Sequence, residues 1–487
     1  MSVDYTYDAA GKPDRETYGN GTFAEYGYNT DTLQLTSLEH YKTATPSNLL
    51  LRGTVYERDM VGSPTKIETV WNNGNSTTTC GYDDINRLTG ATYPGPSSVT
   101  FGYDWVGNRT GEDWGTVNAV DQLPSSPGGA YTYDTVYGNM AAYNNSTTFE
   151  YDDYNLLKLI HWPSSGVSTG FTSDAAGNRV RMIASDDYSH YFVYDTTAGI
   201  PAVLAEQQSS VTPKLYIRTP DGRLIARVTA GSTPSLDFYY HFDALGSTKA
   251  LTNSSGTVTD TYDYDVWGNV THTYGGNQQP YMFVGQLGYY THYQDPMLDP
   301  FSATSGKYVL LQLGVRYYDP EMGTFTQRDG VPNERWSRYA YCEGSPEFWR
   351  DPSGKLVWVP IIGELIGMVG LADAAIIGRC LGRELNEAQI LMHRCEREAW
   401  EMRIKPMPRC DLLGHCYMGC QSVRCSQHMR CVARFLVGRM DANHDVTEEA
   451  YAQHKMYNHR GYGIGWTEQG CMQGCVDFWE KDHYGVR

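Results

Sequence analysis

Four cysteines near the end of the chain form two pairs with the same spacing. Cys416 and Cys420 are four residues apart, and so are Cys471 and Cys475. On a helix this spacing places both thiols on one face. Two such helices lying side by side would suit two disulfides, most simply Cys416–Cys475 and Cys420–Cys471. Zinc is the alternative chemistry, but zinc sites favour two residues between paired cysteines, so we expect disulfides and no metal.

A second stretch in the same region resembles the start of a calcium-binding loop at Asp441. Val446 stands where such a loop requires glycine, and Ala452 stands where it requires an acidic residue. We therefore prefer a helix N-cap at Thr447. The residues identify no catalytic nucleophile here and give no reason to expect a cofactor. Any activity of this region is thus unidentified.

The chain changes composition near residue 355. Residues 1–355 carry a net charge of −17, and residues 356–487 carry −1. By residue type, 34 of the 39 tyrosines lie in the first part, and nine of the 11 cysteines lie in the second. We infer two kinds of structure. The acidic first part argues against a nucleic-acid partner, because phosphate binding requires a basic surface.

The second part begins with an apolar segment at residues 356–378. Its length approaches that of a membrane span, but Glu364 and Asp373 would be costly in lipid. A buried helix or hairpin and a membrane-active segment both fit. Residues 379–403 have the spacing of an amphipathic helix. We expect residues 379–487 to form a small, mostly α, cysteine-rich module.

The first part is built from a recurring unit, clearest at residues 101–109, Phe-Gly-Tyr-Asp-Trp-Val-Gly-Asn-Arg. Most gaps between equivalent aspartates are 18–22 residues, and these aspartates occupy positions 83, 104, 134, 152, 174, 195, 221, 243 and 265. The aspartate can open a turn, and the glycine three residues later supplies a left-handed conformation. Asn86 and Asn155 replace that glycine in two units, as the turn permits. About twenty residues correspond to one hairpin.

Such hairpins cannot bury an apolar face alone and must stack on their neighbours. We therefore predict a mainly β repeat array, with each aspartate at a hairpin turn and the tyrosine rings stacked in rows. Helical periodicity is nearly absent before residue 356.

Three blocks carry a resemblance to a known family. Residues 242–247 read Phe-Asp-Ala-Leu-Gly-Ser, and residues 283–286 read Phe-Val-Gly-Gln. The third, Arg-Tyr-Tyr-Asp-Pro-x-x-Gly-x-Phe, contains Arg316, Tyr317, Tyr318, Asp319, Pro320 and Gly323, and Pro352 and Gly354 follow near its end. The chain resembles RHS (rearrangement hot spot) or YD-repeat proteins, with the repeats at 1–242 and the repeat-associated core at 243–355. The resemblance implies a β strip that spirals into a hollow shell around a variable C-terminal segment, as in bacterial toxin complexes, polymorphic toxins and teneurins. Because the repeats are few here, we expect a shell or a partial cup.

The resemblance also implies self-cleavage just after Gly354 by two aspartates, which correspond here to Asp329 and Asp351. Two close carboxylates can share a proton and act as acid and base. Gly330 replaces the family's usual proline, and Lys355 replaces its leucine. A Lys355 ammonium paired with an aspartate would oppose the shared-proton state, so we expect slow cleavage or none. The alternative to self-cleavage is that both aspartates only open turns.

Three functions fit the sequence. In the first, an RHS-type shell carries or encapsulates its own C-terminal module, a polymorphic toxin with a target-cell surface or an immunity protein as partner. The second is a secreted or cell-surface adhesion protein, and the third is a remnant of a longer gene. Residues 1–5 show no secretory signal, and the repeats begin immediately. We expect a secreted or cell-surface location for a chain that begins in mid-array.

Overall fold

The structure is a computed structural model that describes residues 2–355, apart from residues 10, 44–48, 72–73, 96, 197–200, 210, 221 and 331–335. The apolar segment, the helix expected at 379–403 and the two cysteine pairs lie outside the described residues. The chain divides into two compact units, Met1–Met368 and Val369–Arg487. The strands that the structure describes all belong to the first unit.

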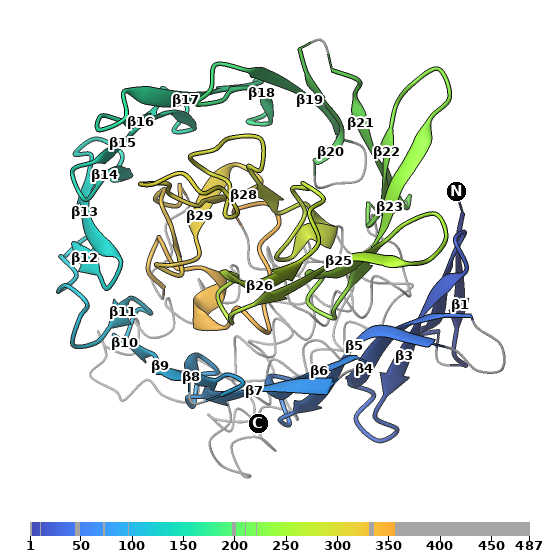
Figure 1. Cartoon of the computed structure of the whole chain (residues 1–487). Coiled ribbons are helices and arrows are strands. Elements are labelled where there is room, and N and C mark those ends of the chain that lie inside the picture. Colours follow the sequence, from blue (N-terminus) through green and yellow to red (C-terminus); the bar gives the residue numbers. More distant parts are fainter. Residues whose placement is uncertain are drawn as a thin grey trace, which may run out of the picture. The chain divides into compact units, whose positions relative to one another are not determined.

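Antiparallel strands form most of the described structure (Figure 1). The first sheet contains β1 (Val3–Tyr7), β2 (Pro13–Tyr18), β3 (Thr22–Tyr28), β4 (Leu35–Lys42), β5 (Leu49–Arg58), β6 (Pro64–Trp71), β7 (Gly74–Tyr82), β8 (Leu88–Thr92) and β9 (Ser98–Thr100). A two-stranded sheet follows, with β10 (Gly102–Tyr103) and β11 (Arg109–Thr110).

The second large sheet has fifteen strands, each paired with the next along the chain. They are β12 (Ser125–Ser126), β13 (Gly129–Tyr133), β14 (Met140–Tyr143), β15 (Thr147–Tyr151), β16 (Leu157–Trp162), β17 (Val167–Ser173), β18 (Arg179–Ile183), β19 (Ser189–Asp195), β20 (Ala202–Gln208), β21 (Lys214–Arg218), β22 (Leu224–Thr229), β23 (Ser235–Phe242), β24 (Thr248–Thr252), β25 (Val258–Tyr264) and β26 (Val270–Tyr274).

A small four-stranded sheet follows in sequence: β27 (Tyr290–Thr291), β28 (Leu311–Leu313), β29 (Arg316–Asp319) and β30 (Thr324–Phe325). Helix in the described ranges is limited to two 3-10 turns, η1 (Gly285–Leu287) and η2 (Cys342–Gly344). Neither could span a membrane. The prediction of a β array without helices before residue 350 is confirmed for the part of the chain that the structure describes.

The repeat turns have the predicted chemistry. Asp104 Oδ1 accepts hydrogen bonds from the backbone N–H groups of Val106 at 3.1 Å and Asn108 at 2.9 Å. Gly107 then takes φ +88°, a conformation that glycine adopts without strain. Asn86 and Asn155 replace that glycine with φ +63° and +66°. Asparagine therefore substitutes at the left-handed position, as the sequence predicted.

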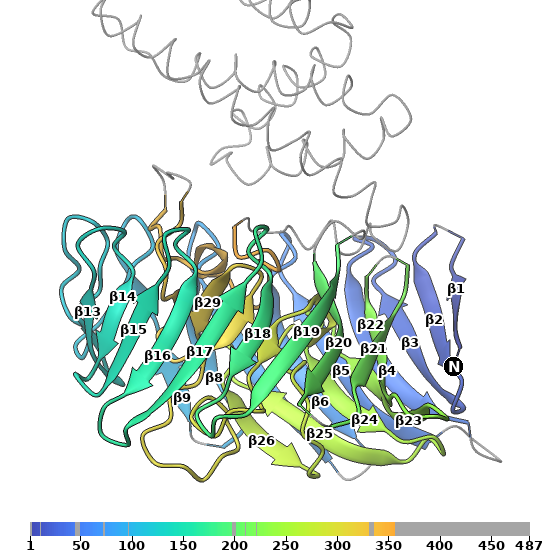
Figure 2. The same cartoon turned by 90° about the horizontal axis from the view of Figure 1, so that it is seen from above.

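The strands form a wall that completes one turn and overlaps itself (Figure 1). Side-chain contacts join the first strands to the last, although the two groups lie far apart in the sequence. Asn20 donates to Thr252 Oγ1 at 3.0 Å, and Arg52 forms an ion pair with Asp263 at 2.5 Å. The described strands thus close one turn of wall. Viewed from above, they stand side by side with hairpin turns along two rims (Figure 2).

The core segment, residues 275–355, lies inside this turn (Figure 1). One apolar cluster joins it to the fifteen-stranded sheet and includes Phe149, Phe171 and Tyr308. A second cluster joins it to the first sheet and includes Leu88 and Phe283. Parts of both large sheets thus bury apolar side chains against the same segment, which removes apolar surface from water that neither sheet could cover alone.

Tyrosine contacts differ from the expected stacked rows. Tyr281 meets Tyr216 at a centroid distance of 4.9 Å and an interplanar angle of 88°, and it meets Tyr290 at 5.7 Å and 88°. The tyrosine pairs in the described ranges are edge-to-face or tilted, and many join the wall to the core segment. Edge-to-face packing suits the ring quadrupole better than a face-to-face stack. The prediction of stacked rows was therefore wrong.

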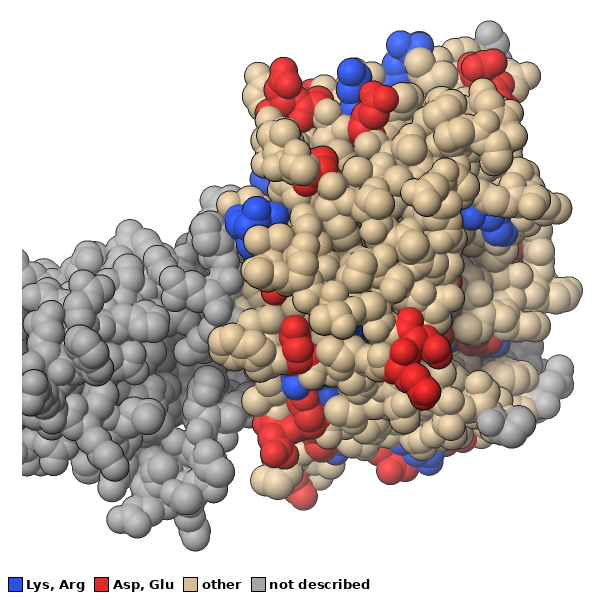
Figure 3. All heavy atoms as spheres, turned by 90° about the vertical axis from the view of Figure 1, so that its left-hand side faces the viewer, with Lys and Arg blue, Asp and Glu red and all other residues tan. Residues whose placement is uncertain are grey.

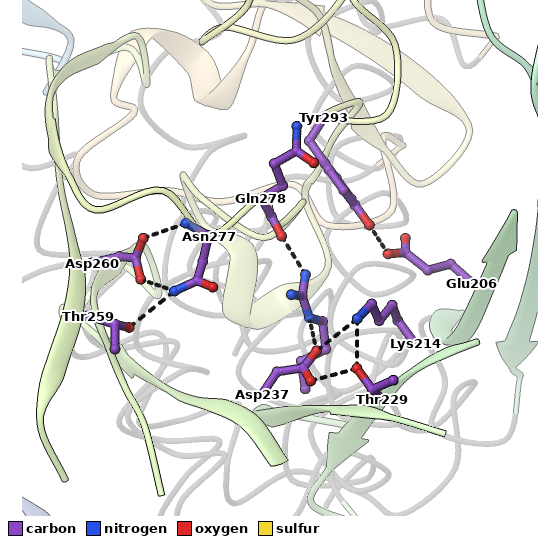
Figure 4. A network of polar contacts seen from close by, with 10 residues as sticks. Glu206, Lys214, Thr229, Asp237, Thr259, Asp260, Asn277, Gln278 and Tyr293 are labelled. Atoms are coloured by element: carbon purple, nitrogen blue, oxygen red, sulfur yellow. Dashed lines mark hydrogen bonds and ion pairs between the residues drawn. The ribbon is translucent and has the colours of Figure 1, made fainter. Parts of the chain in front are cut away.

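Polar contacts also hold the core segment against the wall (Figure 4). Tyr293 donates to Glu206 of β20, and Arg227 of β22 donates to the Gln278 carbonyl at 2.5 Å. Arg227 also pairs with Asp237 at 2.8 Å. A buried cation is thereby satisfied by a carboxylate and a carbonyl from two different parts of the chain.

The outer face of the wall around β13–β16 carries scattered charges (Figure 3). Acidic and basic side chains on this face are separated by broad uncharged areas. This face presents no extended basic surface of the kind that binds nucleic acid.

We predict that substitution of a repeat-turn glycine is costly where the turn meets the core segment. Gly268 has φ +96°, and a Cβ there would lie 2.5 Å from Phe283 Cδ1. Gly21 has φ +81° but nothing within 4 Å of such a Cβ. Gly21→Ala should lose about 1–2 kcal/mol of stability from its backbone conformation. Gly268→Ala should lose about 1–3 kcal/mol more from overpacking. Urea unfolding of the full chain checks this, and equal losses would contradict it.

Candidate functional site

The core segment follows the rim formed by the repeat turns. Gln327 Nε2 donates to the Asn155 carbonyl at 3.0 Å, and the Ser337 N–H donates to the Val106 carbonyl at 2.7 Å. Farther along, the Ser345 hydroxyl donates to the Asn86 carbonyl. As the core segment advances in sequence, its contacts move backward through the repeats. The turns therefore position the segment that carries the candidate site.

Strand β29 presents its side chains to two different clusters. Tyr317 packs with Phe171 of the wall at 5.4 Å between centroids and belongs to the cluster of the fifteen-stranded sheet. Tyr318 belongs to the other cluster, and its hydroxyl donates to the Trp267 carbonyl at 2.8 Å. Successive residues of a strand point to opposite faces. The pair of tyrosines thus fixes β29 between both halves of the wall.

The next residues of the motif form a tight turn. Asp319 Oδ1 accepts from the N–H groups of Glu321 at 2.8 Å and Met322 at 3.0 Å, and Oδ2 accepts from the Tyr308 hydroxyl. Burial raises the pKa of Asp319 to about 6, although the hydrogen bonds from Tyr308 and Met322 oppose this rise. Gly323 has φ +71°. The Asp319 carboxylate thus stabilises this turn.

The Pro320 carbonyl accepts from Asn269 Nδ2 at 2.9 Å, which ties the same turn to the last repeat turn. A Cβ on Gly323 would lie 2.8 Å from Trp267 Cε3. Glycine is therefore required at this position for both its conformation and its close approach to the ring.

Arg316 brings the two predicted aspartates together. Its Nη2 lies 3.3 Å from Asp329 Oδ2 and 3.3 Å from Asp351 Oδ2. Asp351 is almost fully buried, and its exposed fraction is 1%. The chain between the aspartates folds so that both carboxylates reach one nitrogen. The guanidinium supplies the positive charge that allows two carboxylates to lie close together.

The same residues hold the peptide bond between Gly354 and Lys355. Arg316 Nε donates to the Gly354 carbonyl, and the Lys355 N–H donates to Asp351 Oδ1 at 3.1 Å. The Lys355 side chain is exposed. This lysine was expected to approach an aspartate with its ammonium, but it bonds Asp351 through its backbone, and Arg316 supplies the cation.

Two glycines allow this close approach. A Cβ on Gly354 would lie 2.2 Å from the Leu313 carbonyl oxygen, and one on Gly314 would lie 2.2 Å from the Ser353 carbonyl oxygen. Both glycines have positive φ, +65° and +54°. Any larger residue at either position would separate the end of the core segment from β28 and β29.

Three further residues support the cluster; Phe325 is the phenylalanine of the conspicuous Arg-Tyr-Tyr-Asp-Pro block, whereas no role at this site was predicted for Tyr289 or Ser353. The Tyr289 hydroxyl accepts from the Asp351 N–H at 2.7 Å. The Ser353 hydroxyl donates to Asp351 Oδ1 at 3.1 Å. The Phe325 ring lies 3.6 Å from the Arg316 guanidinium carbon. Ser353 could have been found from its place beside the junction, but Tyr289 is far from the junction in sequence and has no local signal.

Burial shapes the electrostatics of the cluster. It lowers the pKa of Arg316, and the nearby charges of Asp351 and Asp329 offset part of that change. Burial also raises the pKa of the Cys342 thiol, and the charge of Asp351 raises it further. Cys342 is therefore a protonated, unreactive thiol.

The structure places the remaining motif residues at the same junction. Pro352 is buried beside Asp351 in the final described turn. The Gly354 N–H donates to the Asp351 carbonyl at 3.3 Å. Asp351 therefore opens a turn, as expected if its role is structural. It also contacts the junction peptide. The cysteine candidates Cys416, Cys420, Cys471 and Cys475 lie beyond the described residues.

Solved structures of Tc toxin complexes have the same fold as this chain. The crystal structure of TcdB2-TccC3-Cdc42 matches with a TM-score of 0.54 at 17% identity, covering 77% of this chain and 20% of that one. TcdB2-TccC3 gives 0.55 at 16% identity, covering 73% and 20%. The Photorhabdus luminescens Tc holotoxin pore gives 0.52 at 15%, covering 73% and 19%. The described residues thus form a β shell of the Tc toxin type.

Curated toxins share part of the sequence, although no protein-family model matches it. The tRNA3(Ser)-specific nuclease WapA of Bacillus spizizenii is 27% identical over 299 residues, covering 58% of this chain and 12% of that protein. The tRNA nuclease WapA of Bacillus subtilis is 26% identical over 299 residues, covering 58% of this chain and 12% of that protein.

Double-stranded DNA deaminase toxin A of Burkholderia cenocepacia is 24% identical over 259 residues, covering 46% of this chain and 17% of that protein. The chain therefore spans less than a fifth of the length of these curated relatives. Taken with the shell fold and the repeats, these similarities support the resemblance of this chain to RHS-type proteins.

We predict that Arg316 is needed for stability because it neutralises a buried carboxylate. Arg316→Gln should lose about 3–5 kcal/mol, since Asp351 would keep its burial without its cation. Arg15→Gln is the matched control, because Arg15 also lies 3.6 Å over a phenylalanine ring. Its ion pair with Glu25 is exposed, at 3.8 Å, and its loss should be about 1 kcal/mol or less. Urea unfolding of both variants compares them, and similar losses would refute the role.

Proposed function

We propose that this chain is an RHS-type shell that carries its own C-terminal residues 356–487 as a toxin module. The supporting observation is the double contact on the Gly354–Lys355 peptide, where Arg316 bonds the carbonyl and Asp351 bonds the N–H. This is the point where the composition changes. A shell that only supported adhesion would not require such contacts at the junction with a chemically different segment.

The names of the relatives favour variable effectors on one kind of shell. Two of them are called tRNA nucleases and one is called a DNA deaminase toxin. One Tc structure was solved without its hypervariable C-terminal region. We propose by analogy that this chain acts outside the producing cell, that its shell shields the module, and that the producer is protected by an immunity protein.

The carrier proposal predicts that residues 356–487 are toxic when expressed alone and not when they are expressed together with the shell. Bacteria that express residues 356–487 alone should stop growing, whereas cells that express the full chain should grow for as long as the junction is intact. Residues 1–355 expressed alone are the control for shell toxicity. Viable counts after induction decide the outcome, and unimpaired growth with the isolated module would refute the toxin role.

We further propose that the cluster cleaves the Gly354–Lys355 bond. Asp329, with its side chain 21% exposed, would take a proton from a water molecule whose oxygen bonds to the Gly354 carbonyl carbon. Asp351 would give its proton to the Lys355 nitrogen as the C–N bond breaks, and Arg316 would stabilise the charge on the carbonyl oxygen. In the described geometry Asp351 Oδ1 accepts from that nitrogen. The proton-bearing form is therefore not the resting one, and we expect slow cleavage.

Purified full-length chain on a denaturing gel tests the cleavage. Over days of incubation, a fragment ending at Gly354 should accumulate in the natural chain and be absent in Asp351→Asn. Asp152→Asn is the matched control, because Asp152 forms an equivalent turn with the Tyr154 and Leu156 N–H groups far from the junction. Cleavage that continues in Asp351→Asn, or an intact natural chain, would exclude the proposed chemistry without bearing on the carrier role.

A further inference from the structure

A pair of histidines lies where the wall overlaps itself. His40 is on β4 near the start of the wall, and His241 is on β23 near its end (Figure 1). Their exposed fractions are 3% and 0%. The two rings meet at a centroid distance of 4.8 Å. They are therefore buried by the contact between two strands that lie far apart in the sequence.

The two imidazoles form a continuous chain of hydrogen bonds across this overlap. His40 Nε2 lies 2.7 Å from the Phe242 carbonyl oxygen. His40 Nδ1 lies 3.1 Å from His241 Nδ1. His241 Nε2 lies 2.8 Å from Thr252 Oγ1. All four ring nitrogens thus have a partner, and two of the three contacts in the chain join β4 to β23.

The acceptor at one end fixes the protonation of the whole chain. A carbonyl oxygen only accepts, so His40 Nε2 must carry its proton, and the Nδ1 of a neutral His40 is then bare. His241 Nδ1 must donate to it, which leaves His241 Nε2 to accept from the Thr252 hydroxyl. Every bond is therefore satisfied when both rings are neutral. A proton added to His40 Nδ1 would place two N–H donors face to face unless His241 moved its own proton from Nδ1 to Nε2, and with both rings protonated the two donors would oppose each other in any case.

Protonation of His241 Nε2 is no better accommodated. Thr252 Oγ1 already accepts from Asn20 Nδ2 at 3.0 Å. It would have to give up the bond that it donates to His241. The Tyr18 ring of β2 packs against His241 at 4.8 Å and offers no negative charge there, because burial raises its pKa well above its usual value.

The surrounding charges disfavour an additional cation. Arg52 of β5 is the register partner of His40, and it shares Asp263 of β25 with Lys249 of β24. Two cations thus already face one carboxylate. Lys42 at the end of β4 is a third cation and bonds the Ser255 carbonyl.

Two acidic groups complete the surroundings. Glu16 of β2 is buried and accepts hydrogen bonds from Tyr5 and Tyr26. Asp243 follows β23 in the repeat turn. Neither is a hydrogen-bond partner of the two imidazoles in the chain described above. A second positive charge on the histidine pair would therefore be buried without a carboxylate beside it.

We propose that the His40–His241 pair makes closure of the wall sensitive to acid, so that protonation of the pair releases β1–β6 from β23–β25. The shell is closed at neutral pH and opens along its overlap when it enters an acidic environment. This property belongs to the described wall and does not depend on self-cleavage or on the activity of residues 356–487.

The direction of the pH effect follows from the two states. Burial lowers the pKa of His40 to about 4, although its bond to the Phe242 carbonyl opposes this. Burial, and then the neighbouring His40, also hold the pKa of His241 well below its usual range. In an opened wall both would titrate near their usual value, about 6.5. The closed wall binds fewer protons, so closure is strongest above about pH 6.5 and weakens as the pH falls toward 4.

Other groups of the overlap do not reproduce this effect. Burial alone would raise the pKa of Asp263, but Lys249 and Arg52 outweigh it and lower that pKa to about 2. Asp263 therefore stays ionised in this range. Burial raises the pKa of Asp243 against the opposing charge of Lys249, so its protonation on acidification favours the closed form. Between about pH 6.5 and 4.5 the histidine pair is therefore the element of the described overlap that acid turns against closure, and the Asp263 ion pairs act in the same direction only near and below pH 4.

Hydroxyl-radical footprinting of the full chain from pH 7.5 to 4.5, read by mass spectrometry, tests the proposal. Tyr18 and Tyr239 are buried in the overlap, with exposed fractions of 3% and 2%. Both should become oxidisable as the pH falls, while Phe171, buried in the wall elsewhere, stays protected. With two protons taken up, the ratio of closed to open wall should fall by about 100-fold per pH unit between pH 6 and 4.5.

Variants decide whether the histidines cause the change. In His241→Asn the dependence should fall to about tenfold per pH unit, and in His40→Gln/His241→Asn acid should no longer weaken closure. The comparison uses the pH dependence of the ratio of closed to open wall and not its absolute value. A variant whose wall closes more weakly at all pH values therefore remains informative. His241→Gln replaces His241→Asn if the latter loses protection at Phe171. His161→Asn, on β16 and away from the overlap, should keep the natural slope. Tyr18 protection that is unchanged down to pH 4.5, or an unaltered slope in the double variant, overturns the proposal.

Discussion

The hydrogen bonds that repeat aspartates such as Asp104 and Asp152 accept from their own turns are the constraint on which the rest of the structure depends. In the unit at Asp174, the carboxylate accepts from the N–H groups of Ala176 and Asn178 at 2.9 Å each. Because the aspartate side chain accepts from these backbone N–H groups, the turn needs no neighbouring strand to satisfy them. Carbonyls of several such turns then accept from the core segment. The repeats are thus both wall and support.

The core segment, in turn, is the common partner of two sheets that would otherwise each expose an apolar face. Its adjacent tyrosines Tyr317 and Tyr318 belong to different clusters. A displacement of β29 would therefore disturb both halves of the wall. Arg316 is on the same strand, so the position of the junction peptide is tied to the packing of the whole shell. The site is thus built on a strand that packs against both apolar clusters.

Closure of the wall depends on a different kind of contact from its curvature. Neighbouring strands pair by backbone hydrogen bonds, whereas the overlap of β4 and β5 with β23 and β25 rests on side chains such as His40 and Arg52. Backbone pairing changes little with pH, but an overlap held by imidazoles responds to it. A shell of this construction can keep its strands paired while its overlap opens. This separation would suit a carrier that must be stable in one environment and open in another.

The sequence by itself determined the repeat, the turns and the junction, because these depend on local chemistry. Asp104 and Gly107 reveal a turn within four residues, and Asn86 in place of glycine supports it. The family motif further indicated that Asp329 and Asp351 belong to one site. These predictions required no knowledge of which segments meet in space.

The tertiary structure decided everything that depends on distant contacts. It placed Arg316 between the aspartates, brought Tyr289 to the Asp351 backbone, and paired His40 with His241. It also replaced the expected rows of stacked tyrosines with edge-to-face contacts between wall and core. No local pattern encodes these neighbours, because the curvature that brings them together accumulates over many successive pairs of twisted strands. Local hydrogen bonds specify each hairpin, but only the completed turn of the wall determines which side chains meet across it.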